Sequence, residues 1–172
     1  MKHSLLTLLT VLAITTVARA ESTVKLTGVH LCCKGCVTGV GKAVAKVQGA
    51  SAACDAESET VTLTAPDAAT AQSAVDALVA AGYFGKSENA AIKVKDTSGA
   101  KDAKVAKLAV NDVHLCCGKC VTAVNKALEK VSGVTGNTAE KNAKTFEVTG
   151  NFSPKEIFAA LQAAGLTGKA GN

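Results

Sequence analysis

Residues 30–36 read His-Leu-Cys-Cys-Lys-Gly-Cys, and residues 114–120 read His-Leu-Cys-Cys-Gly-Lys-Cys. Six of the seven cysteines of the chain lie in these two stretches. Each stretch follows a short apolar run and precedes a segment of helical periodicity, so each predicts a loop that ends at the start of a helix. The rest of the chain is expected to hold these two cysteine loops in place.

The two stretches belong to a longer internal repeat. Most positions are identical when residues 30–49 are aligned with residues 114–133, and residues 77–82 match residues 160–165. Self-similarity of this kind indicates a tandem duplication. We therefore expect two small domains of the same fold.

The apolar pattern predicts the same elements in both halves. Val24 and Leu26 alternate with polar residues, which is typical of a half-buried strand, and Leu108 and Val110 repeat this before the second cysteine stretch. Helical spacing follows each cysteine stretch, as one apolar stripe of valines and leucine. Its members are Val37, Val40, Val44 and Val47 in the first half, and Val121, Val124, Leu128 and Val131 in the second.

Two strands, a second helix and a last strand complete each half. The strands are predicted at 50–54 and 61–63, and at 134–139 and 146–148. Asp67 is the expected cap of the second helix in the first half, and residues 153–156 form a capping-box sequence in the second. The last strand is expected at 92–94 in the first half, and as short or absent in the second.

The order strand, helix, strand, strand, helix, strand predicts the fold class. It is α+β, with two tandem ferredoxin-like (βαββαβ) domains, each an antiparallel sheet with its helices on one face. The first domain is predicted at 21–95 and the second at 105–172, with a charged linker at 96–104.

Residues 1–20 predict a cleaved signal peptide. A basic start precedes a diluted apolar run at 5–17, and Ala18-Arg19-Ala20 matches a signal-peptidase site. A retained anchor is the alternative, but the run is short for a stable membrane span. The mature protein is then periplasmic or secreted, where cysteines are more often disulfide-bonded than free.

Composition excludes some function classes. Without the two basic residues of the predicted leader, the 17 basic and 14 acidic residues give a net charge of +3. This charge is mild and evenly spread, which argues against nucleic acid or an anionic membrane as a partner. The three histidines form no plausible Ser-His-Asp set, so we expect no enzyme. With no Trp, one Tyr and four Phe, bulky core material is scarce, and we expect modest stability without a metal or a disulfide.

The chain resembles the heavy-metal-associated (HMA) domain family of copper chaperones, mercury-binding proteins and metal-pumping ATPase repeats. That family has a Gly-Met-x-Cys-x-x-Cys loop, a Val-x-Gly-Val sequence and a Gly-Tyr pair. Residues 131–134 and 82–83 match the last two. The resemblance implies metal binding by the Cys-x-x-Cys thiols, and a metal-transporting or metal-accepting protein as partner. Those thiols are Cys33, Cys36, Cys117 and Cys120.

Both copies depart from the family motif in the same way. Leucines 31 and 115 replace its methionine, His30 and His114 replace its glycine, and Cys32 and Cys116 are additional thiols. The second half also has Gly165-Leu166 in place of Gly-Tyr. The additional thiols and the histidines are further candidate ligands.

The chemistry of Cys-x-x-Cys at a helix start favours a soft metal. A helix N-terminus stabilises thiolate, which is the form that ligates metal. Thiolates select Cu(I), Zn(II), Hg(II) or Cd(II) over hard cations. Two thiolates suit Cu(I), and Cys32 or His30 would complete the three or four ligands of Zn(II). Cu(I) or Zn(II) is therefore the expected ion.

Adjacent residues of an extended loop point to opposite sides, so Cys32 and Cys33 are expected to diverge, with His30 on the side of Cys32. Cys54 is expected on an edge strand as a packed or free thiol. The linker would permit the two Cys-x-x-Cys pairs to face each other in a four-sulfur site.

Three functions remain open at this point. The first is a non-catalytic metal-binding protein that sequesters or transfers a soft metal. The second is a thiol–disulfide redox protein, for which Cys-x-x-Cys at a helix start is also suited. The third is a structural or interaction module in which disulfides fasten the cysteine loops.

Overall fold

The computed structural model describes residues 20–171. Residues 1–19 of the predicted signal peptide therefore lie outside the described part of the chain. Within that part, no helix is both long enough and apolar enough to cross a membrane.

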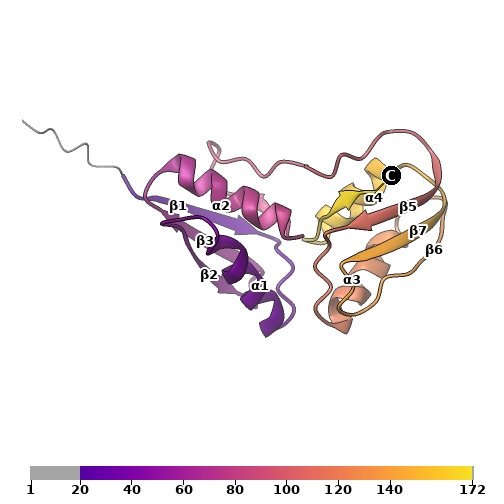
Figure 1. Ribbon diagram of the computed structural model, residues 1–172, viewed down its shortest axis with the longest axis horizontal. Helices are drawn as coiled ribbons and strands as arrows, with labels where there is room; N and C mark the ends of the chain where they lie inside the picture. Colours follow the sequence, from indigo (N-terminus) through magenta and orange to yellow (C-terminus); the bar gives the residue numbers. More distant parts are fainter. Residues whose placement is uncertain (1–19, 172) are drawn as a thin grey trace, which may run out of the picture.

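The described chain folds into two units of the same architecture, as predicted (Figure 1). The first contains β1 (Ser22–Thr27), α1 (Lys34–Val44), β2 (Ser51–Asp55), β3 (Thr60–Ala65), α2 (Ala68–Ala80) and β4 (Lys86–Ser87). The second contains β5 (Val105–Asn111), α3 (Gly118–Leu128), β6 (Val134–Asn137), β7 (Thr145–Phe152), α4 (Pro154–Ala163) and β8 (Lys169–Ala170). The sheet orders are β2-β3-β1-β4 and β6-β7-β5-β8, with antiparallel neighbours. Each unit therefore has the ferredoxin-like fold.

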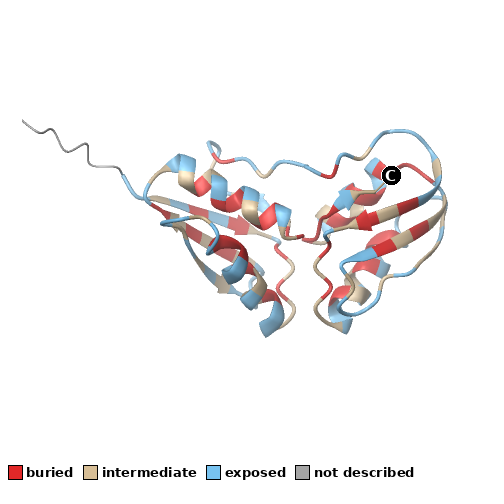
Figure 2. Cartoon of the chain, in the orientation of Figure 1, coloured by how far each residue is buried: buried red, intermediate tan, exposed pale blue. Residues whose placement is uncertain are grey.

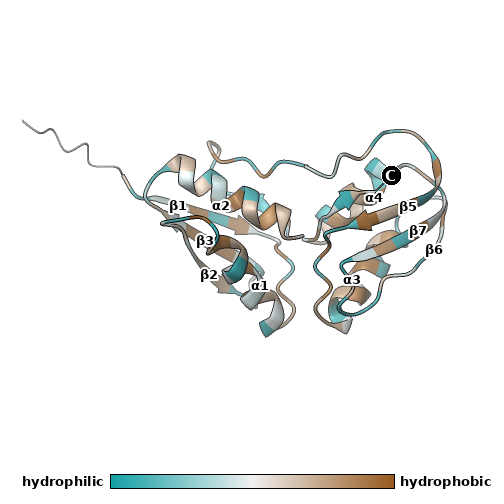
Figure 3. Ribbon diagram, in the orientation of Figure 1, coloured by the Kyte–Doolittle hydropathy of each residue, from teal (hydrophilic) through white to brown (hydrophobic). Residues whose placement is uncertain are grey.

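The cores are built from the predicted alternation. Val24 pairs with Leu63 and Leu26 with Val61 across β1 and β3, and all four side chains are buried. Figure 2 shows buried residues on the faces where helices meet each sheet, and Figure 3 shows that those faces are hydrophobic. One face of the sheet and the buried sides of its two helices thus supply the core of each unit.

The last strand of the first unit is not where the sequence predicts it. It is β4, whose Lys86 and Ser87 pair with Thr27 and Leu26 of β1. Residue 93 instead exchanges two hydrogen bonds between its backbone and the Gln72 side chain on α2. Ile92 is buried there, so the apolar alternation at 92–94 reflects a loop that packs on the core.

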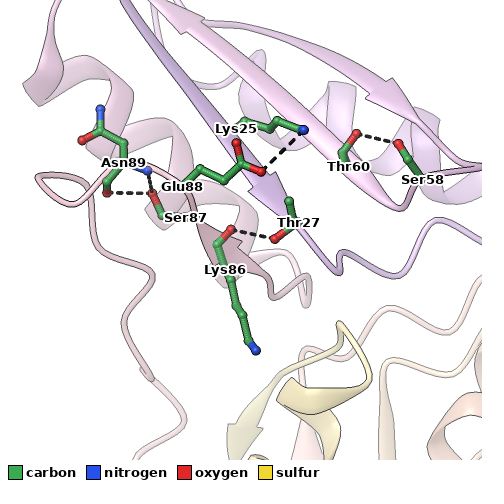
Figure 4. A network of polar contacts seen from close by, with 8 residues as sticks. All are labelled: Lys25, Thr27, Ser58, Thr60, Lys86, Ser87, Glu88 and Asn89. Carbon is green, nitrogen blue, oxygen red and sulfur yellow. Dashed lines mark hydrogen bonds and ion pairs between the residues drawn. The ribbon is translucent and has the colours of Figure 1, made fainter.

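Polar side chains attach β4 to its neighbour (Figure 4). The Thr27 hydroxyl donates to the Lys86 carbonyl, and the Lys25 ammonium lies 3.5 Å from a Glu88 carboxylate oxygen. The short β8 of the second unit confirms the prediction of a short or absent strand there.

One of the two predicted helix caps is confirmed. The Asp67 carboxylate accepts a 2.8 Å hydrogen bond from the backbone N–H of Thr70, as an N-cap should. The capping box at 153–156 is wrong in its side-chain part, because the Ser153 hydroxyl donates to Asp102 of the connecting segment. Pro154 still opens α4 at its first turn.

The two units meet through the glycine turns that follow α2 and α4. Tyr83 and Leu166 form an antiparallel bridge, in which Phe84 N–H donates to Gly165 and the residue 167 N–H donates to Gly82. Gly82 and Gly165 have φ of +88° and +76°. A Cβ on Gly82 would lie 2.7 Å from the backbone nitrogen of His114, so this close approach requires glycine.

The connecting segment at 96–104 also packs on the second unit. The backbone carbonyl of Ser98, a buried residue, accepts a hydrogen bond from Ala170 in β8. The two units are thus joined by backbone pairing at the glycine turns and by the segment that connects them.

Candidate metal centre

Each cysteine motif lies between the first strand and the first helix of its unit. Cys33 and Cys117 occupy the N-cap positions of α1 and α3, and neither side chain caps its helix by a hydrogen bond. The next cysteine follows within one turn, because Cys36 N–H donates to the Cys33 carbonyl and Cys120 repeats this with Cys117. Each helix start therefore presents two thiols from one turn.

Within a unit, the thiols lie close together. The Sγ–Sγ distance is 3.9 Å for Cys33–Cys36 and 3.9 Å for Cys117–Cys120. The additional cysteines join them: Cys32 lies 3.6 Å from Cys36, and the corresponding pair in the second unit is 3.7 Å apart.

The shortest sulfur separations are between the units. Cys32 Sγ lies 3.4 Å from Cys117 Sγ, and Cys33 Sγ lies 3.4 Å from Cys116 Sγ. Cys36 and Cys120, both fully buried, are 4.0 Å apart. Figure 1 shows the two loops facing each other. All six motif cysteines thus converge on one cluster, not only the four that facing Cys-x-x-Cys pairs would supply.

The expectation that Cys32 and Cys33 point to opposite sides is wrong. Their sulfurs lie within 4.8 Å of each other and of Cys117. Strict alternation applies along a continuous strand, whereas this chain turns into α1 directly after Cys33.

Protons are shared unevenly in the cluster. A hydrogen bond from the Cys120 thiol lowers the pKa of Cys36 to about 2, while burial raises the pKa of Cys32 to about 12. Its hydrogen bond to Cys36 raises the pKa of Cys120, and burial raises that of Cys116. Burial acts against ionisation of Cys117, but the backbone N–H of Cys120 lowers its pKa to about 6. The arrangement therefore places thiolates beside thiols, and a cation would replace those protons.

The two motif histidines have different surroundings. His30 offers a ring nitrogen within 4.8 Å of the sulfurs of Cys32 and Cys120, so it lies on the side of Cys32, as predicted. Its Nε2 is buried and has no hydrogen-bond partner among the described residues. Burial lowers the pKa of His30, which favours the neutral ring that can ligate a metal.

His114 is held by a tyrosine of the other unit. Its Nε2 lies 3.0 Å from the Tyr83 hydroxyl, and that hydroxyl donates a 2.9 Å hydrogen bond to the carbonyl of Cys36. Leu166 occupies the place of Tyr83 in the second unit and has no hydroxyl to offer His30. The sequence marked Tyr83 only as half of a Gly-Tyr pair, and nothing local in it indicated this contact.

Cys54 does not join the cluster. It lies on the edge strand β2, as predicted, and is a half-buried free thiol. Burial raises its pKa. It therefore serves as an internal control for the motif cysteines.

The sulfur spacing fits a metal bound by thiolates. Metal–sulfur bonds of about 2.3 Å place three trigonal sulfurs about 4.0 Å apart, and four tetrahedral ones about 3.8 Å apart. The observed separations of 3.4–4.0 Å differ from the trigonal value by 0.6 Å or less. An open groove lined by Cys32, Cys33 and Lys119 exposes one side of the cluster to solvent. The cluster can therefore hold soft metal ions and exchange them.

Comparisons with known proteins give only remote similarities. No family model matches the chain, and no curated protein matches it. The solved structures that are similar include two of Bacillus subtilis CopA. The structure of its N-terminal soluble domains has 16% identity and a TM-score of 0.33, and the match covers 89% of this chain and 95% of that one. The water-soluble region of the P-type ATPase CopA has 18% identity and a TM-score of 0.29, over 87% and 90%. Because both scores are low, the functional conclusion depends on the sulfur geometry of this chain.

Proposed function

We propose that this protein binds a soft metal ion through the cysteines of its two motifs and sequesters it or transfers it to another protein. One observation carries the proposal: six thiols from two separate motifs converge to within 3.4–4.0 Å of their neighbours. Clustered thiols repel one another once they ionise, and a soft cation removes that repulsion. Cu(I) is the preferred ion and Zn(II) the alternative.

A binding role without catalysis fits the same surroundings. The groove beside Cys32 and Cys33 is open, so an incoming thiolate of a metal-accepting protein can reach the cluster and exchange ligands. The buried Cys36 is held in place by the Tyr83 hydroxyl, which donates a hydrogen bond to its backbone carbonyl. A periplasmic or secreted location follows if residues 1–20 are a leader, and a bound metal would then protect the thiols from oxidation.

The test is the metal content of anaerobically purified protein. We expect Cu(I), or failing that Zn(II), to bind the reduced chain and to be lost when Cys33, Cys36, Cys117 and Cys120 are replaced by serine. The Cys54→Ser variant is the matched control and should keep its metal. A fully reduced chain that takes up neither metal would contradict the proposal.

Thiol–disulfide exchange is the second candidate. Sulfurs 3.4 Å apart need to move by little more than 1 Å to form a disulfide, whose S–S bond is about 2.0 Å. The lowered pKa of Cys117 would supply an attacking thiolate. Catalysed reduction of a model disulfide, with no metal uptake by the reduced chain, would favour this function over metal binding.

A further inference from the structure

The six sulfurs of the motifs have a definite shape. Nine pairs lie 3.4–4.0 Å apart. Three more, Cys32–Cys33, Cys33–Cys117 and Cys116–Cys117, lie within 4.8 Å. These twelve separations are the edges of an octahedron. Its opposite corners are Cys32 and Cys116, Cys33 and Cys120, and Cys36 and Cys117.

An octahedron contains four alternate triangular faces that meet only at corners. Here the three sulfurs of each of three such faces lie within 4.8 Å of one another: Cys32/Cys33/Cys117, Cys33/Cys36/Cys116 and Cys116/Cys117/Cys120. The fourth is Cys32/Cys36/Cys120, with sides of 3.6, 3.5 and 4.0 Å. Every motif cysteine belongs to two of the four faces. Each sulfur can therefore bridge two metal ions, and each ion can have three sulfur ligands.

From this geometry we propose that the protein holds four Cu(I) ions in one cluster, each bound by the three thiolates of one face and every thiolate shared by two ions. The inference rests on the proposed metal-binding function and adds its ion and stoichiometry. Cu(I) is soft and accepts three thiolates in a plane. Zn(II) needs four sulfurs in a tetrahedron, and no four corners of an octahedron form one.

The charge balance favours several monovalent ions over one. As copper binds, each sulfur that is still a thiol releases its proton to solvent, so that all six become thiolates. Copper remains Cu(I), so no oxidant or reductant is consumed. Four Cu(I) ions neutralise all but two of the six thiolate charges. Lys34 and Lys119 line the groove beside Cys32 and Cys33 and lie near the remaining charge. A single ion would leave the cluster far more negative or still largely protonated.

The arrangement also explains the additional cysteine of each motif. Cys32 and Cys116 are opposite corners, and each contributes to two faces. Two independent sites would use only the Cys-x-x-Cys pairs, yet the sulfurs of each pair are 3.9 Å apart, and those of different units approach to 3.4 Å.

The experiment is an anaerobic titration of the reduced protein with Cu(I)–acetonitrile, followed by native mass spectrometry and copper X-ray absorption. We expect monomers with no copper and with four to dominate, with few intermediates, and copper–copper scattering at the four-copper point. The Cys54→Ser control should also reach four. The Cys32→Ser/Cys116→Ser variant removes two bridging sulfurs and should stop below four, without copper–copper scattering.

The other outcomes distinguish a failure of the four-copper cluster from a failure of the proposed metal-binding function. One or two coppers per chain without copper–copper scattering, unchanged in the Cys32→Ser/Cys116→Ser variant, would overturn the cluster and leave metal binding intact. Four coppers found only in dimers would also overturn it. No copper bound at any ratio would overturn the cluster, and a parallel Zn(II) titration without uptake would overturn the metal-binding function as well.

Discussion

The Tyr83 hydroxyl of the first unit lies 3.0 Å from Nε2 of His114 in the second, and their rings are 4.6 Å apart between centroids. The same hydroxyl donates its only proton to the carbonyl of Cys36. It must therefore accept from His114, because a phenol has one hydrogen to give. This pair connects a cysteine loop of one unit to the motif histidine of the other.

Removing that hydroxyl should loosen the contact between the units. Tyr83→Phe keeps the ring but leaves the Cys36 carbonyl and His114 without this partner, so we expect a loss of about 1–2 kcal/mol in the free energy of unfolding. Chemical denaturation of the metal-free reduced protein measures it. Ser58→Ala removes an exposed hydrogen bond to Thr60 and should change stability by less than about 0.5 kcal/mol. Equal stability of Tyr83→Phe and the wild type would show that the hydroxyl does not support the interface.

Two glycines of α1 provide a matched pair of substitutions. A Cβ on Gly39 would collide with the Tyr83 hydroxyl and lie 2.9 Å from Cε1 of His114, whereas one on Gly41 would meet nothing within 4 Å. Gly39→Ala should therefore destabilise the protein by about 1–3 kcal/mol. Gly41→Ala should stabilise it by up to about 1 kcal/mol through helix propensity. Unfolding midpoints compare them, and the opposite order would contradict the packing.

The close packing of Gly39 against Tyr83 is absent from the second unit, where both residues are replaced. In the repeat, Ala123 stands at the position of Gly39 and Leu166 at that of Tyr83. Leu166→Tyr alone should overpack against Ala123 and cost about 1–3 kcal/mol. Adding Ala123→Gly should recover part of that loss, which a double-mutant cycle detects as a favourable coupling energy. Strictly additive effects on the free energy of unfolding would show that the side chains at 123 and 166 do not pack against each other.

The two histidines should respond differently to removal. His114→Ala removes the ring that contacts Tyr83, so the metal-free protein should lose about 1 kcal/mol or more. His30→Ala removes a buried Nε2 that has no partner among the described residues, so the metal-free protein should lose less. Denaturation of both variants in the same buffer provides the comparison. Greater destabilisation by His30→Ala would mean that its ring contributes more than its contacts indicate.

The fold could be predicted largely because it is encoded locally. The alternation at Val24 and Leu26 and the apolar stripe through Val40 and Val44 each bury the faces they indicate. The error at 92–94 has the same origin, since Ile92 is buried in a loop and alternation reports burial, not pairing. Lys86 and Ser87 of β4 carry no apolar signal at all.

The sequence predicted which residues are candidate ligands, but not how they are arranged in space. All eight candidate ligands lie in the two motifs, each formed by a loop and the first turn of the following helix. The spacing of Cys33 and Cys36 follows from that turn of helix. The convergence of the two loops depends on the pairing of Gly82 and Gly165 turns and on Tyr83, which are long-range contacts. A local pattern contains no information on such contacts, so the six-sulfur cluster was not foreseen.

The central claim is that both motifs form one metal centre. The most direct measurement is the copper bound, and its affinity against a Cu(I) chelator, after all three cysteines of one motif are replaced by serine: Cys32, Cys36 and Cys33. A shared centre predicts far less than half of the wild-type copper and much weaker retention of the remainder. The mirror variant at 116, 117 and 120 should behave alike. Retention of half the copper at unchanged affinity in both variants would contradict the shared centre, because it would show two independent sites.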